Sequence, residues 1–315
     1  MAANWMRRMV AAGVSAALLT ACGSSTTESA IAPQRLIAFG DAMSDVGQNG
    51  TRYTVNDGSI NNWTLQIAAK YDKPLTPVSA GGTSYATGNA RIVAKPDAAG
   101  NASTRTLSEQ IDSFLAKDRF AKDDLVLMNG GLSDLIAGMA AVNLGTQTEA
   151  AQLAAAFQAG QDMAAQVRRL VAAGARHVLL TGSYDLGKTP WAKVMGREAV
   201  LGRASSRFNE GLLLGIVDLG ANALYVDSAY YVNLYTGSPS SYGFNNATDA
   251  VCTSVDASNG IGIGPGQINA ALCNSATLRP DAKQDTYVFA DFVHLTPSAQ
   301  RQFGTFAYDR LRARW

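Results

Sequence analysis

The chain has no marked excess of charge of either sign. Its 315 residues include 26 basic and 25 acidic side chains, for a net charge of +1, so the composition gives no electrostatic case for nucleic-acid binding. Beyond the N-terminus no hydrophobic run is long enough to cross a bilayer, and no internal repeat is visible. With 47% hydrophobic and 8% aromatic residues, the sequence suits one globular α/β domain with a sizeable core.

Cysteine is also scarce, and the first of the three cysteines follows a short hydrophobic run. Arg7 and Arg8 precede residues 9–21 (MVAAGVSAALLTA), a run too short for a spanning helix but of the length of a signal-peptide core. The end of this run, residues 19–23 (LTACG), resembles the lipobox of bacterial lipoproteins, in which Cys22 would become the lipidated first residue of the mature chain. The alternative is a plain secretory signal in which this cysteine is incidental.

The sequence therefore predicts three segments. They are a lipoprotein signal over residues 1–22, a polar tether over 23–34 (GSSTTESAIAPQ) and one domain over 35–315. Gly23 rather than an aspartate follows the cysteine, which favours the outer membrane over the inner membrane if the source is Gram-negative. The domain would then be exported and held at the bacterial envelope, in the periplasm or at the cell surface, through a lipid on Cys22.

The other two cysteines, Cys252 and Cys273, lie in a region rich in Gly, Asn and Ser without clear periodicity. Export would place them in an oxidising compartment, where a disulfide is the expected state. Closing a loop of this size stabilises a fold by about 3 kcal/mol in the chain-entropy account. Two free thiols or a metal-binding pair are the alternatives, although no other cysteine and no nearby histidine completes a tetrahedral set of ligands.

Four short apolar runs have the pattern of strands buried on both faces of a parallel sheet. They are residues 36–39 (LIAF), 125–128 (LVLM), 178–181 (VLLT) and 223–226 (ALYV). Helical stretches are expected at 107–115, 150–173 and 197–219, the last two ending at Gly174 and Gly220. This alternation predicts a doubly wound, three-layer α/β/α sandwich with a mainly parallel sheet, in which ligands bind beyond the carboxyl ends of the strands.

Five segments, in order along the chain, carry a recognisable pattern. Residues 39–45 (FGDAMSD), 81–90 (GGTSYATGNA) and 291–297 (DFVHLTP) resemble the F-G-D-S-L-S-D, G-G-T-N-Y-A-x-G-G-A and D-x-x-H-x-T/P blocks of the SGNH/GDSL family of ester hydrolases. Residues 129–134 (NGGLSD) resemble the family's G-x-N-D block, and 185–190 (DLGKTP) resemble a stretch common in its bacterial members. Together they span nearly the whole predicted domain.

The resemblance implies a flavodoxin-like SGNH sandwich that hydrolyses carboxylic esters without a metal or an organic cofactor. His294 would be the general base, and Asp291 would orient it and stabilise the imidazolium. The chain has only one other histidine, His177, which lies at the start of a predicted strand and is expected to be structural. Thr296 and Pro297 are typical of a helix start directly after the catalytic pair.

The segment that resembles the nucleophile block lacks the nucleophile. Ala42 stands where the family has serine, and it has no oxygen with which to attack a carbonyl. The oxyanion would be stabilised by the backbone N–H groups of Ala42 and Gly88 and by Ser133, which replaces the family's asparagine with a shorter donor. Losing the serine costs a serine protease roughly a millionfold in turnover. Ser44 is a candidate substitute nucleophile, but as the expected start of a helix it also suits an N-cap or turn role.

Two functions remain open. The first is an exported esterase or lipase acting on a lipid or another acylated small molecule, through Ser44 or through water activated by His294. The second is a non-catalytic pseudo-hydrolase that binds an acyl or carbohydrate ligand, such as an acylated glycan. The intact signal peptide and the second departure at Ser133 indicate natural divergence rather than one engineered substitution. Aromatic side chains near the expected rim of such a site are Trp63, Tyr85, Tyr184, Trp191, Tyr230 and Tyr231, and ordinary packing is the favoured alternative role for most of them.

Overall fold

The fold was analysed in a computed structural model that describes residues 31–315. The predictions of a signal segment, of a lipidated Cys22 and of most of the tether therefore fall outside the described residues. Residues 31–315 form one structural unit. None of the helices in this part of the chain combines the length and the hydrophobicity needed to span a bilayer.

Four parallel strands form the central sheet, in the order β1-β2-β3-β4. They are β1 (Arg35–Phe39), β2 (Asp124–Asn129), β3 (His177–Thr181) and β4 (Ala223–Tyr225). Each strand matches a predicted apolar run to within one residue at either end, and β2 is buried along its whole length. Burial on both faces explains the uninterrupted apolar runs of β1, β2 and β3, whereas β4, at the end of the strand order, is only partly buried.

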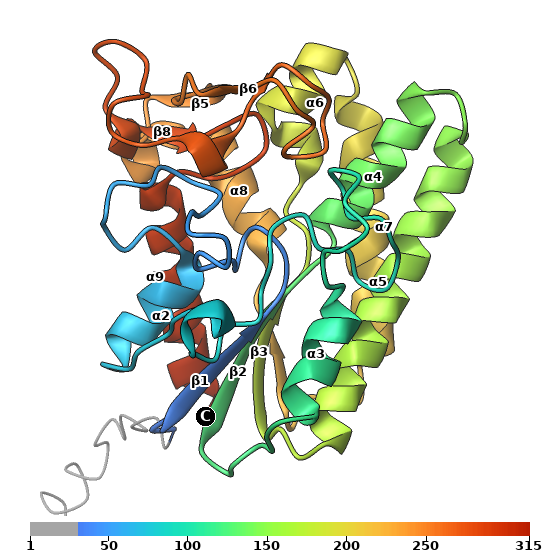
Figure 1. Cartoon of the computed structure of the whole chain (residues 1–315), viewed down its shortest axis with the longest axis vertical. Helices are drawn as coiled ribbons and strands as arrows, with labels where there is room; N and C mark the ends of the chain where they lie inside the picture. The colour runs from blue at the N-terminus through green and yellow to red at the C-terminus, as the bar shows by residue number, and fades with distance from the viewer. Residues whose placement is uncertain (1–30) are drawn as a thin grey trace, which may run out of the picture. The chain divides into compact units, whose positions relative to one another are not determined.

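Helices cover both faces of the sheet, which confirms the three-layer α/β/α sandwich (Figure 1). On one side α2 (Trp63–Lys70) packs against α9 (Pro297–Arg314). On the other side lie α3 (Leu107–Leu115), α4 (Leu132–Asn143), α5 (Glu149–Ala172) and α7 (Glu198–Gly215). The remaining helices are α6 (Pro190–Met195), α8 (Ser228–Gly237) and the 3-10 turns η1 (Val78–Ala80), η2 (Leu186–Lys188), η3 (Pro239–Tyr242), η4 (Ala270–Leu272) and η5 (Gln284–Thr286).

The helix ends follow the sequence predictions in two cases and depart from them in one. Helix α3 has the predicted bounds, and α5 ends just before Gly174, whose φ of 103° suits a residue past a helix end. Helix α7 ends at Gly215 rather than at residue 219, so the prediction that Gly220 follows this helix is wrong. Arg168 of α5 donates from Nε to the Gly215 carbonyl at 2.9 Å, so a side chain from another helix satisfies the helix end.

A small irregular layer built from residues 245–290 lies beyond the carboxyl ends of the sheet strands (Figure 1). It contains the parallel pair β5 (Asn246–Ala250) and β8 (Tyr287–Phe289), and the antiparallel pair β6 (Val255–Asp256) and β7 (Gln267–Ile268). The predicted disulfide between Cys252 and Cys273 is present. Both cysteines belong to a second, smaller apolar core beside Val55, Val251, Ala270 and Ala290.

Candidate active site

The turn that follows β1 is built around Gly40. A Cβ atom at this position would lie 2.0 Å from Asn129 Oδ1, and its φ is 151°, so a side chain would be excluded on both counts. Gln110 of α3 holds the same residue from the other side. Its Oε1 accepts from Gly40 N and its Nε2 donates to Gly40 O, each at 2.9 Å. The end of β1 is therefore held in place by the side chains of Asn129 and Gln110, which lie outside the motif of residues 39–45.

Asp41 is fully buried beneath this turn. Its Oδ1 accepts from Asn129 Nδ2 at 2.6 Å and from Met43 N at 3.2 Å. Burial raises the pKa of Asp41, although these hydrogen bonds and the nearby charge of His294 oppose the shift. The Asp41 carboxyl also accepts a hydrogen bond from the backbone of Ser133, which lowers its pKa further. Through this bond Asp41 links the first turn of α4 to the turn after β1.

Ala42 occupies the middle of the turn, directly beyond the sheet. No group among residues 31–315 accepts a hydrogen bond from its backbone N–H. This donor is consequently available to an oxygen atom of a ligand, as expected for one arm of an oxyanion hole. The side chain is a methyl group and supplies no nucleophile.

Ser44 closes the same turn, so of the N-cap and turn roles predicted for it the turn role is the one observed. No helix starts here, because the backbone N–H groups of Ser44 and Asp45 both donate to Asp41 O at 3.1 Å and the chain continues in turns. The Ser44 side chain is fully buried, and its Oγ accepts from Trp63 Nε1 at 3.0 Å. Its hydroxyl therefore packs beneath the site and serves as the hydrogen-bond acceptor of a core indole.

Asp291 and His294 meet in the loop that leads into α9, as their spacing predicted. His294 Nδ1 lies 2.8 Å from Asp291 Oδ2, and the other oxygen, Oδ1, accepts from the N–H groups of Val293 at 2.8 Å and His294 at 2.6 Å. Ala270 N also donates a hydrogen bond to Asp291 Oδ2 at 2.9 Å. Thr296 then caps α9, with Pro297 in its first turn. The local sequence thus builds both the pair and the helix behind it.

The hydrogen bonds decide the charge state of Asp291. Burial alone would raise the pKa of this carboxyl, but the charge of His294 and the bonds from His294 and Val293 outweigh it, so the pKa lies below its usual value. An ionised Asp291 accepts the proton on His294 Nδ1 and leaves Nε2 as the basic nitrogen. No residue of the described part bonds to Nε2, so no hydroxyl of residues 31–315 is held against the candidate base.

The oxyanion donor expected at Gly88 is engaged elsewhere. Gly88 N donates to Asp45 Oδ2 at 2.8 Å in a buried bond, so it does not point freely toward a substrate. The prediction for Gly88 therefore needs correction: this N–H holds the second motif onto the first. The hydroxyl of Ser133, at the start of α4, has no hydrogen-bond partner among residues 31–315 and remains a candidate donor.

Tyr53 is a site residue that sequence reasoning missed. Its ring packs on Gly88, where an added Cβ would lie 2.0 Å from Tyr53 Cε2, and its centroid is 5.2 Å from that of His294. Burial, followed by the charges of Asp45 and other nearby carboxylates, raises the pKa of Tyr53, so the phenol stays protonated as a donor. No motif marks this position, because residues 51–60 have no periodicity or family pattern.

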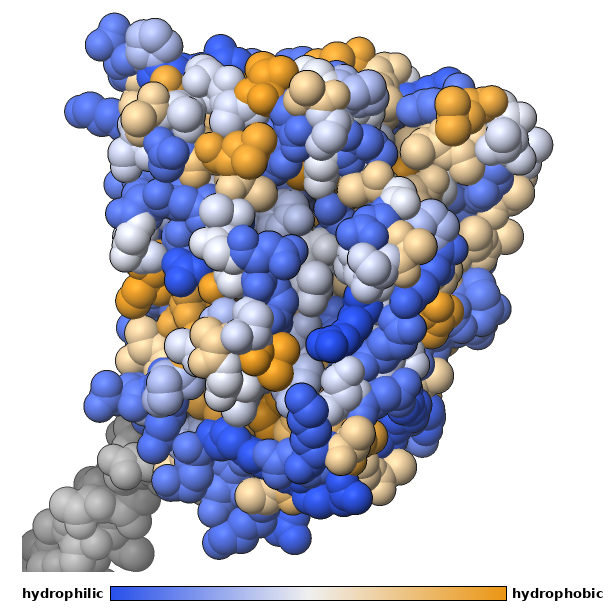
Figure 2. All heavy atoms as spheres, in the orientation of Figure 1, coloured by the Kyte–Doolittle hydropathy of each residue, from blue (hydrophilic) through white to orange (hydrophobic). Residues whose placement is uncertain are grey.

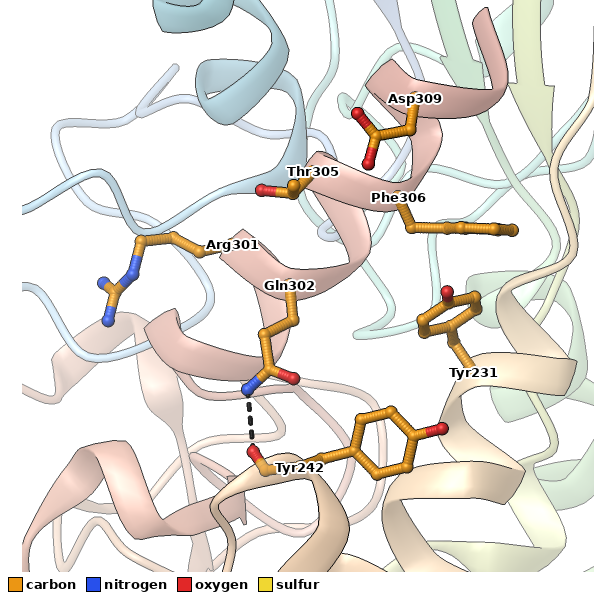
Figure 3. Close-up of a pocket in the computed structure, with 7 residues that line it drawn as sticks. All are labelled: Tyr231, Tyr242, Arg301, Gln302, Thr305, Phe306 and Asp309. Atoms are coloured by element: carbon orange, nitrogen blue, oxygen red, sulfur yellow. Dashed lines mark hydrogen bonds between the residues drawn. The ribbon is translucent and has the colours of Figure 1, made fainter. Parts of the chain in front are cut away.

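Four of the six aromatic residues considered for the rim are buried in the core, so packing is their main role. Trp63 and Tyr184 are core residues, and the Tyr184 hydroxyl donates to Val293 O, in the loop that carries His294, at 2.7 Å. Tyr231 lies on α8 against Phe306 of α9, where it lines a separate depression of about 390 Å³ (Figure 3). In that depression Gln302 Nε2 donates to Tyr242 O at 3.0 Å. Tyr231 is therefore not part of the site around His294.

The comparisons with known proteins agree with the fold. Residues 36–305 match the family described as GDSL-like Lipase/Acylhydrolase. The chain is also 26% identical over 317 residues to an "Uncharacterized protein in trpE-trpG intergenic region" of Pseudomonas putida. That alignment covers 89% of this chain and 49% of the relative, so the chain spans about half the length of the curated relative. Across residues 31–315, no cluster of three or more His, Cys, Asp or Glu side chains is placed to hold a metal ion.

Proposed function

Because the chain belongs to the family of GDSL-like lipases and acylhydrolases, we propose that it binds a carboxylic ester at the ancestral site and does not cleave it by a serine mechanism. The lineage chemistry is ester hydrolysis, which needs a nucleophile, a base and an oxyanion hole. The Asp291–His294 pair provides a base, and the free N–H of Ala42 provides one donor of an oxyanion hole. The nucleophile is absent.

The observation that carries the proposal is the burial of Ser44. This hydroxyl is the nearest in sequence to Ala42, and a relocated nucleophile at this position would have to be within reach of His294 and of a bound carbonyl carbon. It bonds instead to Trp63 Nε1 and has no exposed surface. Exposing it would break a buried hydrogen bond in the core, so the site is better suited to holding an ester than to acylating a residue.

The test is ester turnover by the unaltered chain. Short p-nitrophenyl esters are incubated with the chain and, in parallel, with Ser44→Ala and His294→Ala. We expect all three proteins to release p-nitrophenol at the rate of buffer alone. Release by the unaltered chain that His294→Ala abolishes but Ser44→Ala leaves intact would show instead that the base activates water. Release that Ser44→Ala abolishes would establish a relocated nucleophile.

We propose further that the domain is exported and lipid-anchored through Cys22, with outer-membrane sorting if the source is Gram-negative. The support is sequence alone: two arginines, the apolar run of residues 9–21 and the lipobox-like residues 19–23. Metabolic labelling with palmitate should mark the chain and should disappear in Cys22→Ala. Labelling that persists in this variant would overturn the anchor.

A further inference from the structure

A depression of about 390 Å³ between α8 and α9 combines aromatic and polar walls (Figure 3). We refer to it as the α8–α9 depression. Tyr231 of α8 and Tyr242 of η3 line it together with side chains of α9. The α9 residues Gln302, Thr305, Phe306 and Asp309 are spaced so that they share one face of the helix. The volume of the depression falls in the range of small-molecule sites.

The concentration of aromatic rings distinguishes this depression from the surface seen in Figure 2. On that face, strongly hydrophobic residues lie in small groups separated by hydrophilic ones, so the described residues seen there form no broad apolar area. In the α8–α9 depression, by contrast, the rings of Tyr231, Tyr242 and Phe306 gather beside polar side chains. This composition suits a small molecule that is neither purely apolar nor purely polar.

The core holds the aromatic rings of the depression in place. The rings of Tyr231 and Phe306 lie against each other, with centroids 4.1 Å apart. The buried ring of Tyr235 contacts both tyrosines of the depression, with centroids 5.8 Å from Tyr231 and 5.2 Å from Tyr242. Tyr231 and Tyr242 themselves are only partly buried. The rings are therefore already positioned, and a ligand that contacts them does not have to order them.

The polar groups beside these rings have hydrogen-bonding capacity that the fold does not use. Within residues 31–315, no hydrogen bond or ion pair engages the carboxylate of Asp309 or the hydroxyl groups of Tyr231 and Tyr242. Burial raises the pKa of Tyr231, and the neighbouring Tyr242 and Asp309 raise it further. The Tyr231 hydroxyl therefore stays protonated and is available as a donor, while Asp309 is available as an acceptor.

The remaining polar side chains of α9 add one acceptor and one donor. Gln302 uses Nε2 on a backbone carbonyl of η3 and keeps Oε1 free. Thr305 Oγ1 accepts a hydrogen bond from α2 at 3.1 Å and keeps its own hydrogen. Arg301 also lines the depression, but its Nη2 lies 2.8 Å from Asp285 Oδ1, and Figure 3 shows its guanidinium directed away from the tyrosine rings. It therefore adds no free positive charge.

Three classes of small molecule suit this set of groups poorly. A hydrocarbon chain would remove Asp309 and the hydroxyl groups from water without giving them partners. An anion would be repelled by the Asp309 carboxylate, and the free lining groups among residues 31–315 include no cation to offset this repulsion. An organic cation binds over open aromatic faces, but Tyr231 and Phe306 each cover one face of the other.

We infer that the α8–α9 depression binds a pyranose ring of a carbohydrate. The C–H groups of such a ring suit the negative face of an aromatic side chain. Its hydroxyl groups both donate and accept, and so match the tyrosine hydroxyls, Gln302 Oε1 and the Asp309 carboxylate. Helix α9 begins three residues after His294, but the depression shares no lining residue with the ancestral site. The inference therefore goes beyond the proposed function and does not depend on it.

The test measures the binding of single sugars to the full chain carrying Cys22→Ala, a variant that needs no detergent. Methyl β-glucopyranoside, methyl β-galactopyranoside and N-acetylglucosamine are titrated by saturation-transfer NMR. At least one of them should bind with a Kd on the order of 1 mM, as expected for the few contacts that one ring can form. Saturation should transfer mainly to C–H protons of the sugar ring, because these lie against the aromatic side chains.

Two surface variants locate the sugar. Asp309→Ala removes a charged acceptor and should weaken binding about tenfold, whereas Glu198→Ala, at an exposed carboxylate on α7, should change the Kd less than about twofold. Tyr231→Phe removes only a hydroxyl group and should weaken binding about fivefold. Its matched control is Tyr230→Phe, at the exposed neighbour on α8 that does not line the depression. Neither test variant empties a buried position, so both should fold as the parent does.

Sugar binding unaffected by both Asp309→Ala and Tyr231→Phe would overturn the inference, as would a parent that binds none of the three sugars. Binding that His294→Ala abolishes would place the sugar in the ancestral site and would also contradict the assignment. Tetramethylammonium is titrated in parallel, and a depression that binds it in place of the sugars would be a cation site instead. Ester cleavage by the unaltered chain would overturn the proposed function and leave the sugar assignment standing.

Discussion

The indole nitrogen of Trp63 donates a hydrogen bond to Ser44 Oγ at 3.0 Å, and both side chains are completely buried. The indole belongs to α2, which packs against α9, the helix that begins just after His294. The only serine in the motif FGDAMSD is thus part of the core beneath the site. This contact gives the hydroxyl a structural role that can be measured.

Ser44→Ala should lower the free energy of unfolding by about 1–2 kcal/mol, because the buried Trp63 N–H would lose its acceptor. Urea unfolding followed by Trp fluorescence measures this change. Ser206→Ala, which removes an exposed hydroxyl on α7, is the matched control and should be close to neutral. A Ser44→Ala protein as stable as the parent would show that the indole bond contributes nothing.

Asp291→Asn should destabilise the fold by about 2–4 kcal/mol at neutral pH, since the amide presents an NH₂ group to donors that now bond to a carboxylate. The pKa of Asp291 is lowered in the folded state, so its stabilising effect is present above the unfolded value of about 4 and is lost as pH falls through the folded value. The difference between parent and variant should therefore shrink toward pH 3. A difference that is constant from pH 7 to pH 3 would contradict this assignment.

The contribution of Asp134 to stability should depend on pH in the opposite direction to that of Asp291. Burial raises its pKa to about 6, although Arg91 Nε at 3.2 Å and Ile92 N at 2.9 Å both favour the charged form. Ionisation then costs stability, so the parent should lose about 2 kcal/mol relative to Asp134→Asn as pH rises from 4 to 7. Unfolding at several pH values measures this. Asp285→Asn, at a mostly exposed carboxylate, is the control. An Asp134→Asn variant that fares worse at pH 7 than at pH 4 would mean that the Arg91 pair outweighs burial.

Removal of the disulfide should destabilise the layer above the sheet. The bond between Cys252 and Cys273 closes a separation of 21 residues, and the double variant Cys252→Ser/Cys273→Ser should lose about 3 kcal/mol of unfolding free energy in the chain-entropy account. The denaturation midpoint of the parent should fall on addition of dithiothreitol, and that of the double variant should not change. Equal midpoints for both proteins, with and without reductant, would contradict this role.

The strands could be predicted because their burial on both faces leaves a signal in the chain itself. Residues 36–39 and 125–128 are predicted as strands because every side chain is apolar. In the structure the first strand is longer by one residue, and the second is longer by one residue at each end. The Asp291–His294 pair could be predicted equally well, because a spacing of three residues suits a turn. Thr296 and Pro297 also mark the start of the helix that follows it. Local sequence determines these features.

The remaining features depend on contacts between distant segments. The end of α7 is set by Arg168 on another helix, and the N–H of Gly88 is taken by Asp45, 43 residues away in the sequence. Tyr53 reaches the site from a segment without periodic pattern. Such positions carry no local signal, because they are selected by the shape of the folded site rather than by the strand or helix that bears them.

The most direct test of the central claim, that the site lacks its nucleophile but keeps its base, is the rate of p-nitrophenyl butyrate hydrolysis by Ala42→Ser. We expect hydrolysis at least about a hundredfold above the unaltered chain, because restoring the serine returns part of the roughly millionfold effect of this group. Ala42→Gly, which changes the same position without adding a hydroxyl, should gain nothing, and the gain should vanish in Ala42→Ser/His294→Ala. A folded Ala42→Ser protein that remains as inactive as the parent would contradict the account.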